Sequence, residues 1–194
     1  MGTCYTASVA IARYMREMLN SYLTNILVEP HIATEGSAFY LKPIMDDTLV
    51  IVIAQSGTTV DTNVYVKMAK ERGAMSLAIA NKREGDITFL VDGTLYIGNG
   101  RDIEIAVPST KTYICHIVVG YLLTYFFDQE IKNTGDNNYL SLKELSDLPE
   151  QIASTIENYK SIKLESCLNK FLENTHWYVV YDSPSSFIAG MEAR

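Results

Sequence analysis

Residues 49–59 read Leu49-Val50-Ile51-Val52-Ile53-Ala54-Gln55-Ser56-Gly57-Thr58-Thr59, an apolar run followed at once by a polar turn. The run 49–53 is unbroken and rich in β-branched residues, which is typical of a strand buried on both faces of a parallel sheet. Gly57 permits a tight turn, and the sequence that follows predicts a helix over about 61–72. This stretch therefore predicts a strand, a turn and a helix of an α/β protein.

The polar turn carries hydroxyl groups on Ser56, Thr58 and Thr59. Thr59 or Asp61 can cap the helix, and the free backbone N–H groups at a helix start attract anions. Capping alone explains one of these side chains, but it does not explain the whole group together with Gln55. We therefore predict that this turn binds a small phosphate group.

A second polar turn reads Val107-Pro108-Ser109-Thr110-Lys111 and precedes the longest apolar stretch of the chain, residues 114–127. Ser109 and Thr110 can cap the helix that this stretch predicts, and Lys111 can neutralise a phosphate as a point charge. A helix cap and a solvated lysine are the simpler alternative. Because both turns lead from an apolar segment into a helix, the pair predicts a cradle for a sugar phosphate.

Predicted strands alternate with predicted helices along much of the chain, which favours βαβ units and a parallel sheet covered on both faces. We predict an α/β fold: a three-layer sandwich with a mainly parallel sheet of about five strands, plus linker helices. The expected strands are 25–29, 49–53, 76–80, 93–97 and 177–181. The expected helices are 7–22, 33–40, 61–72, 87–91, 114–127, 142–159 and 162–173.

The polar run 133–138 is the clearest linker. It divides the chain into a predicted phosphosugar-binding domain at 1–132, a helical linker at 139–174 and the start of a second, truncated unit at 175–194. Apolar residues at helical spacing over 142–159 indicate core packing or a partner face. Without a second unit to cover it, part of this face would be exposed, so we expect a homodimer.

The composition indicates a globular protein and excludes several classes of partner. The chain has 194 residues, of which 47% are apolar, and a formal net charge of −7. Without a cluster of Lys and Arg, we expect no nucleic-acid partner. The longest apolar stretch is shorter than the roughly 20 residues that a membrane helix needs, and no signal peptide is recognisable, so we expect no membrane association.

The cysteines and histidines predict neither a disulfide framework nor a metal site, because they lack the spacing that either requires. A reducing cytoplasm is the expected location, and no cofactor is expected. Cys4 is expected to be a small residue facing the ligand turn rather than a reactive thiol, and His116 a core or partner-facing residue. The residues concerned are Cys4, Cys115, Cys167, His31, His116 and His176.

Three segments, residues 2–6, 55–62 and 103–111, resemble in their order and spacing the sugar isomerase (SIS) domain. The likeness covers about residues 2–128 and is strongest to the isomerase half of the glutamine–fructose-6-phosphate aminotransferases, or glucosamine-6-phosphate synthases. It implies a flavodoxin-like sheet followed by a second SIS copy. The positions that it assigns to the phosphosugar, with Thr58 added from the hydroxyl pattern, are Thr3, Cys4, Gln55, Ser56, Thr58, Thr59, Val107, Ser109 and Lys111.

The chain departs from the pattern of the family at several of these positions. The family often has Ser where this chain has Cys4 and Ala54, Glu where it has Thr58, and Ala where it has Pro108. Each lost hydroxyl removes a hydrogen bond with a net value of about 0.5–1.5 kcal/mol.

The resemblance also implies the chemistry of the parent enzymes, in which fructose 6-phosphate is aminated and isomerised to glucosamine 6-phosphate. It places the catalytic Glu, His and Lys in the second copy and the C-terminal tail, so this chain is expected to have no catalytic residues and to bind without turnover. Two alternatives stay open: another SIS phosphosugar isomerase or deglycase, and a non-catalytic sensor of phosphosugars.

Overall fold

The computed structural model describes most of the chain as two compact units. The first unit comprises residues 1–131 and 181–194, and the second comprises residues 132–180. The sheet and every described candidate site residue belong to the first unit. The residues described are 2–19, 26–98, 110–132, 142–160, 175–176, 178, 180 and 184–193.

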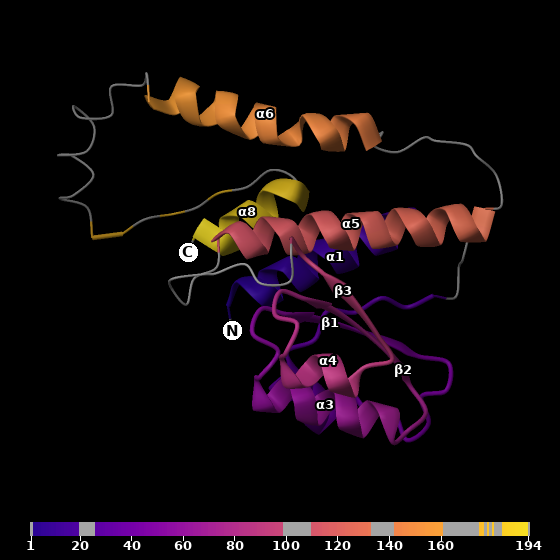
Figure 1. The fold of residues 1–194 in the computed structure, drawn as a ribbon. Helices are drawn as coiled ribbons and strands as arrows, with labels where there is room; N and C mark the ends of the chain where they lie inside the picture. The colour runs from indigo at the N-terminus through magenta and orange to yellow at the C-terminus, as the bar shows by residue number, and fades with distance from the viewer. Residues whose placement is uncertain are drawn as a thin grey trace. The chain divides into compact units, whose positions relative to one another are not determined.

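A parallel sheet forms the centre of the first unit, and its described strands lie in the order β1-β2-β3 (Figure 1). The strands are β1 (Leu49–Ala54), β2 (Met75–Ala80) and β3 (Gly93–Tyr96). Ala54 pairs with Ala80, and Ala80 pairs with Tyr96, so the three strands end together. We call this side of the sheet the carboxyl edge, and ligands of open parallel sheets bind beyond it.

Helices cover both faces of the sheet (Figure 1). α1 (Thr3–Leu19) and α5 (Thr110–Lys132) lie on one face, and α3 (Val60–Lys70) and α4 (Asp86–Leu90) lie on the other. Successive side chains of a strand point to opposite faces, which explains why the apolar run of β1 has no polar break.

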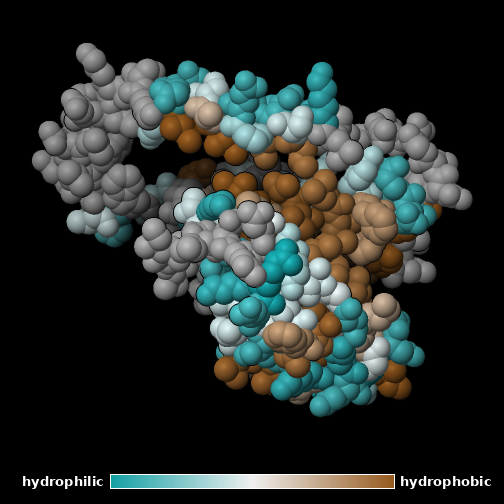
Figure 2. Space-filling model, viewed as in Figure 1, coloured by the Kyte–Doolittle hydropathy of each residue, from teal (hydrophilic) through white to brown (hydrophobic). Residues whose placement is uncertain are grey.

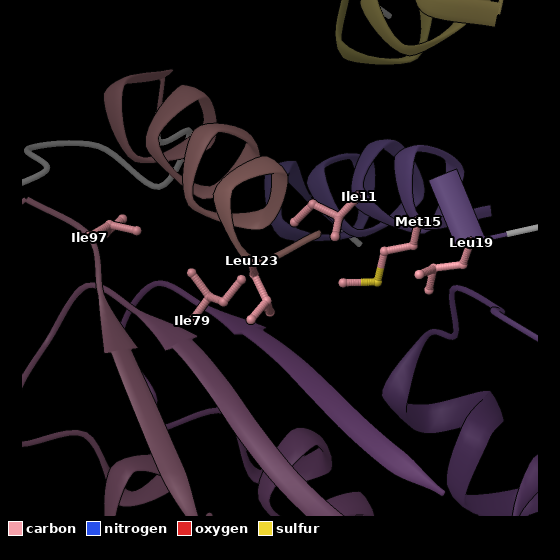
Figure 3. Close-up of a cluster of buried hydrophobic side chains, with 6 residues drawn as sticks. All are labelled: Ile11, Met15, Leu19, Ile79, Ile97 and Leu123. Carbon is pink, nitrogen blue, oxygen red and sulfur yellow. The ribbon is translucent and has the colours of Figure 1, made fainter. Parts of the chain in front are cut away.

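Each face of the sheet has its own core. Figure 3 shows the cluster under α1 and α5, in which Ile79 of β2 and Leu123 of α5 lie close to Ile11 of α1. The cluster on the opposite face is made of smaller side chains, which let α3 and α4 approach the sheet closely. Its members are Val52, Ala54, Val66, Ala78, Ala80 and Ile87.

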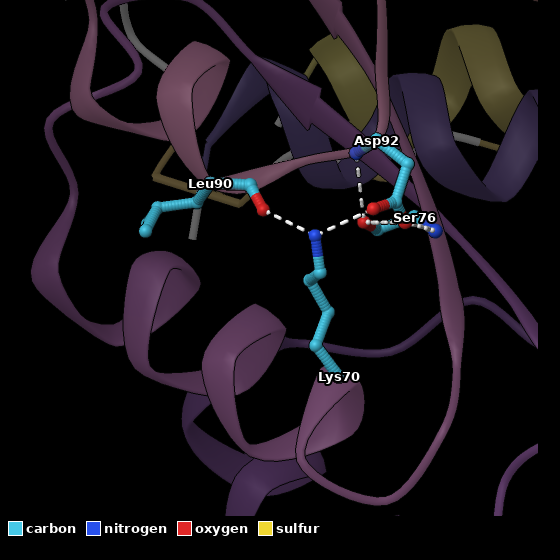
Figure 4. Close-up of polar contacts among 4 residues, drawn as sticks. All are labelled: Lys70, Ser76, Leu90 and Asp92. Atoms are coloured by element: carbon cyan, nitrogen blue, oxygen red, sulfur yellow. Dashed lines mark hydrogen bonds and ion pairs between the residues drawn. The ribbon is translucent and has the colours of Figure 1, made fainter.

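A cluster of polar groups lies at the opposite, amino edge of the sheet (Figure 4). Its members are the side chains of Lys70, Ser76 and Asp92 and the backbone carbonyl of Leu90. The Nζ atom of Lys70 donates to Oδ1 of Asp92 at 2.6 Å and to the carbonyl of Leu90 at 2.8 Å. Oδ2 of Asp92 accepts from the backbone N–H of Ser76 at 2.8 Å and from its hydroxyl at 2.7 Å. Lys70 and then Ser76, both as hydrogen-bond donors, lower the pKa of Asp92 to about 2.

Most predicted elements are confirmed within a few residues. The α/β class is confirmed, as are the strands predicted at 49–53, 76–80 and 93–97. The predicted helices 61–72, 87–91, 114–127 and 142–159 correspond to α3, α4, α5 and α6 (Leu142–Lys160). The helix predicted at 162–173 and residues 177, 179 and 181 of the last predicted strand lie outside the described residues.

One prediction in the N-terminal region was wrong, and a second was confirmed in its range but differs in the type of helix. Residues 26–29 form no strand, because the side chain of Arg16 donates to the carbonyl of Val28 at 2.6 Å in place of a neighbouring strand. The helix predicted over 33–40 is an α-helical turn, α2 (Ala33–Glu35), that continues as a π-helix, η1 (Gly36–Tyr40).

The remaining helices belong to different units. α6 lies in the second unit and is amphipathic, with hydrophilic and hydrophobic residues on opposite sides (Figure 2). α8 (Pro184–Ala193) lies in the first unit and packs against α1. Among the described residues, no helix is long and apolar enough to cross a membrane.

Candidate functional site

The hydroxyl turn between β1 and α3, which we define as residues 55–59, lies at the carboxyl edge of the sheet. The Ser56 and Thr58 hydroxyl oxygens are 3.0 Å apart, and the backbone N–H of Thr58 donates to the Ser56 hydroxyl at 3.3 Å. Thr58 and Thr59 are exposed. The turn thus presents a pair of hydroxyl groups beside the start of a helix, an arrangement that suits an anion.

Helix capping, the simpler explanation of this turn, does not account for Thr59. Thr59 occupies the cap position of α3, but its side chain makes no capping hydrogen bond. Asp61 lies within the first turn of the helix, where its charge interacts favourably with the helix dipole. The hydroxyl of Thr59 is therefore not used to begin the helix, which weakens the simpler explanation of the turn.

The segment that follows β2, residues 81–87, supports the hydroxyl turn through its backbone. Gly57 has a φ of +72°, and its carbonyl accepts a hydrogen bond from the N–H of Ile87 at 2.9 Å. A Cβ atom on Gly85 would collide with the carbonyl of Ser56. Glycine is needed at both positions, because one has a left-handed conformation and the other lies directly against the turn.

The family resemblance placed Thr3 and Cys4 in a loop. In the structure they lie in the first turn of α1, because this helix begins at Thr3. The N–H of Tyr5 donates to the carbonyl of Gly2 at 2.9 Å, which continues the helix back to its first residue. Burial raises the pKa of the Cys4 thiol, and the backbone N–H of Gln55, which donates to it, lowers this pKa to a smaller extent. Cys4 therefore joins α1 to the hydroxyl turn and stays protonated at neutral pH.

The third predicted segment is described only in part. Val107 and Ser109 lie outside the described residues, whereas Lys111 is an exposed residue in the first turn of α5. The same helix reaches the carboxyl edge through His116, whose Nε2 lies 3.3 Å from the carbonyl oxygen of Ala54. α1, α5 and the hydroxyl turn thus meet around the end of β1.

Two residues near the hydroxyl turn were not predicted to have a role there. His116 was interpreted as a core or partner-facing residue, and it is buried against the end of β1. Glu192 of α8 lies near the starts of α1 and α5: burial is the main cause of the raised pKa values of Cys4 and Tyr113, and the Glu192 carboxylate raises them further. The sequence carries no local signal for this approach of α8.

The site combines hydrogen-bond donors with charges of both signs. The starts of α3 and α5 carry hydroxyl groups and the cationic Lys111, which are groups of the kind that bind phosphate, and the carboxylates of Asp61 and Glu192 add negative charge nearby. In the described part of the chain, no group of three His, Cys, Asp or Glu side chains is arranged to hold a metal ion.

Sequence comparisons match the chain to one domain family and to enzymes of one name. Residues 2–125 match the SIS domain family. Glutamine–fructose-6-phosphate aminotransferase (isomerizing) of Clostridium tetani is 37% identical over 177 residues, which are 90% of this chain and 27% of that protein. The enzyme of the same name from Methanococcus maripaludis is 36% identical over 163 residues, 84% of this chain and 25% of the relative. The chain spans about a quarter of the length of these curated relatives.

Solved structures show the same fold at lower sequence identity. The C-terminal domain of glucosamine-fructose-6-phosphate aminotransferase from Francisella tularensis has a TM-score of 0.57 and 21% identity, covering 79% of this chain and 40% of that one. Glucosamine-6-phosphate deaminase from Thermotoga maritima has a TM-score of 0.62 and 18% identity, covering 85% and 47%. With the family match extending over residues 2–125, these findings show that the chain belongs to the SIS domain family.

Proposed function

We propose that this chain binds a phosphosugar at the carboxyl edge of its sheet. The observation that carries the proposal is the exposed pair of hydroxyl groups on Ser56 and Thr58, held on a glycine turn beside the start of α3. Thr59 adds a hydroxyl that does not cap the helix. The full proposed contact set is Thr3, Cys4, Gln55, Ser56, Thr58, Thr59, Val107, Ser109 and Lys111.

The proposed ligands are fructose 6-phosphate and glucosamine 6-phosphate. The names of the relatives support this choice, since both relatives described above are fructose-6-phosphate aminotransferases. The proposed role is that of the phosphosugar-binding half of an enzyme of this kind. The family resemblance places the catalytic side chains in a second SIS copy, so we propose binding rather than turnover for these 194 residues.

Calorimetric titration with fructose 6-phosphate, glucosamine 6-phosphate and inorganic phosphate tests the proposal. Ser56→Ala combined with Thr59→Ala is expected to weaken sugar-phosphate binding about 100-fold, since two hydrogen bonds to a charged group contribute about 1.5 kcal/mol or more each. The melting temperature should change little, because neither side chain is in the core.

Thr48→Ala is the matched control, because this hydroxyl lies before β1, at the opposite end of the strand. Unchanged affinity in the double variant would refute the assignment of these residues. Binding of sugar phosphates other than the two named ones would favour a different SIS isomerase, deglycase or sensor.

We also propose that the protein is a homodimer. The apolar side of α6 supports this, since Ile152, Ile156 and Tyr159 recur at helical spacing and are 37%, 52% and 59% exposed. Association would remove this surface from water. Light scattering coupled to size exclusion measures the mass directly, and a monomer at every concentration would contradict the proposal.

A further inference from the structure

His116 occupies an unusual place for a histidine in an apolar helix. Its side chain is 1% exposed, and Nε2 points at the carbonyl oxygen of Ala54 across 3.3 Å. Ala54 is the last residue of β1 and directly precedes the hydroxyl turn. The contact joins positions 62 residues apart and links α5 to the end of β1.

The His116 ring and its partner, the carbonyl of Ala54, contact more than one element at the carboxyl edge. The carbonyl of Ala54 also accepts from the backbone N–H of Asn81 at 3.2 Å, which continues the ladder between β1 and β2. Burial lowers the pKa of His116, and the carbonyls of Ala54, Thr112 and Ile79 oppose this effect. The ring is thus surrounded by backbone carbonyls from β1, β2 and α5, and it is neutral at pH 7.

We propose that His116 is a positioning residue of the phosphosugar site. It holds the hydroxyl turn and the first turn of α5, which carries Lys111, in one fixed arrangement. Apolar packing places α5 over the sheet, and a directional polar contact adds a constraint on its position along its own axis. A hydrogen bond to Ala54 has a direction and a length, so it can set that position. The inference rests on the proposed function.

The proposal specifies the protonation state of the ring. A carbonyl oxygen only accepts hydrogen bonds, so Nε2 of a neutral His116 must carry the proton. Nitrogen-15 NMR of the imidazole in the wild-type protein reads this tautomer directly. A ring protonated at Nδ1 alone would overturn the proposal without any variant having to fold.

Two substitutions test the positioning role. His116→Leu keeps the apolar volume and removes the donor, whereas His116→Gln keeps a side-chain N–H group. We expect His116→Leu to weaken fructose 6-phosphate binding about 5- to 10-fold, the equivalent of one lost net hydrogen bond. Amide hydrogen exchange in residues 55–59 should become faster. His116→Gln should restore both properties at least in part.

His31→Leu is the matched control, because His31 is a partly buried histidine that stacks on Tyr40 and contacts Tyr65. It should leave exchange in the hydroxyl turn unchanged. A folded His116→Leu variant with wild-type exchange and affinity would overturn the inference, as would exchange that rises equally throughout the first unit. If the wild-type chain binds no sugar phosphate, the proposed function fails, while exchange in the turn still decides the role of His116.

Discussion

At the amino edge of the sheet, Asp92 accepts hydrogen bonds from Lys70 and Ser76, whereas at the carboxyl edge Ser56 and Thr58 bond to each other on an exposed turn. Both edges carry small polar residues next to strands. At the amino edge these residues satisfy one another and link α3 to β2 and β3. At the carboxyl edge they face outward, so similar residue types hold the fold at one edge and form the candidate site at the other.

The difference has a geometric cause. Ser76 is near the start of β2 and Asp92 directly precedes β3, so parallel pairing of these strands brings the two side chains together. The hydroxyl turn instead leaves the sheet at the end of β1 and is supported from one side by Gly85. Thr58 and Thr59 on this turn are exposed.

Gly85→Ala should have the largest effect and would break the carboxyl edge alone. The new Cβ would push against the backbone of Ser56, and such overpacking costs about 1–3 kcal/mol, or roughly 5 °C in Tm for a chain of this length. Sugar-phosphate affinity should fall more than about 10-fold, because displacement of the turn misaligns its hydroxyl groups. Calorimetry and thermal melting measure both effects. Glu84→Ala, one residue away and exposed, is the control and should change neither.

Asp92→Asn should have the second-largest effect and would break the amino edge alone. It removes the charge that Lys70 neutralises, so the melting temperature at pH 7 should fall by a few degrees while sugar-phosphate affinity stays unchanged. A large loss of affinity would show that the two edges are coupled, which would contradict the separate roles assigned to them.

The same variant carries a pH signature. The pKa of Asp92 is lowered from 3.8 to about 2, so the unfolded chain takes up the proton at a higher pH than the folded one. The stabilisation by this carboxylate is present above about pH 3.8 and is lost as the pH falls toward 2. The difference in stability between wild type and Asp92→Asn should therefore shrink over this range, as measured by urea unfolding. A difference independent of pH would contradict the assignment.

Cys4→Ser should have the smallest effect and tests whether one more hydroxyl at the carboxyl edge strengthens binding. The substitution places a hydroxyl next to the hydroxyl turn, where the backbone N–H of Gln55 donates to the thiol of the wild-type protein. Calorimetry should show affinity tighter by about 2- to 10-fold, the equivalent of 0.5–1.5 kcal/mol for one hydrogen bond. Cys115→Ser is the control: it lies against the core cluster under α5, so it should lower stability without tightening binding. Weaker binding by Cys4→Ser would show that the thiol itself is needed.

Local patterns predicted the fold well where burial is regular. The apolar run of β1, the long apolar stretch of α5 and the glycine after the strand each identify an element without any knowledge of the rest of the chain. The prediction failed where a distant side chain competes for the backbone, as Arg16 does at Val28. Residue type alone also does not show whether a cap forms, since Thr59 occupies the cap position of α3 and makes no capping bond.

The sequence by itself determined the α/β class, the position of the hydroxyl turn and membership of the SIS domain family, because these depend on residue type and spacing along the chain. Tertiary structure alone decided which polar groups satisfy one another. The contacts of His116 with Ala54 and of Lys70 with Asp92 join residues far apart in sequence. The approach of Glu192 to Cys4 spans nearly the whole chain. Such contacts follow from how helices pack on a sheet, and no local periodicity encodes that packing.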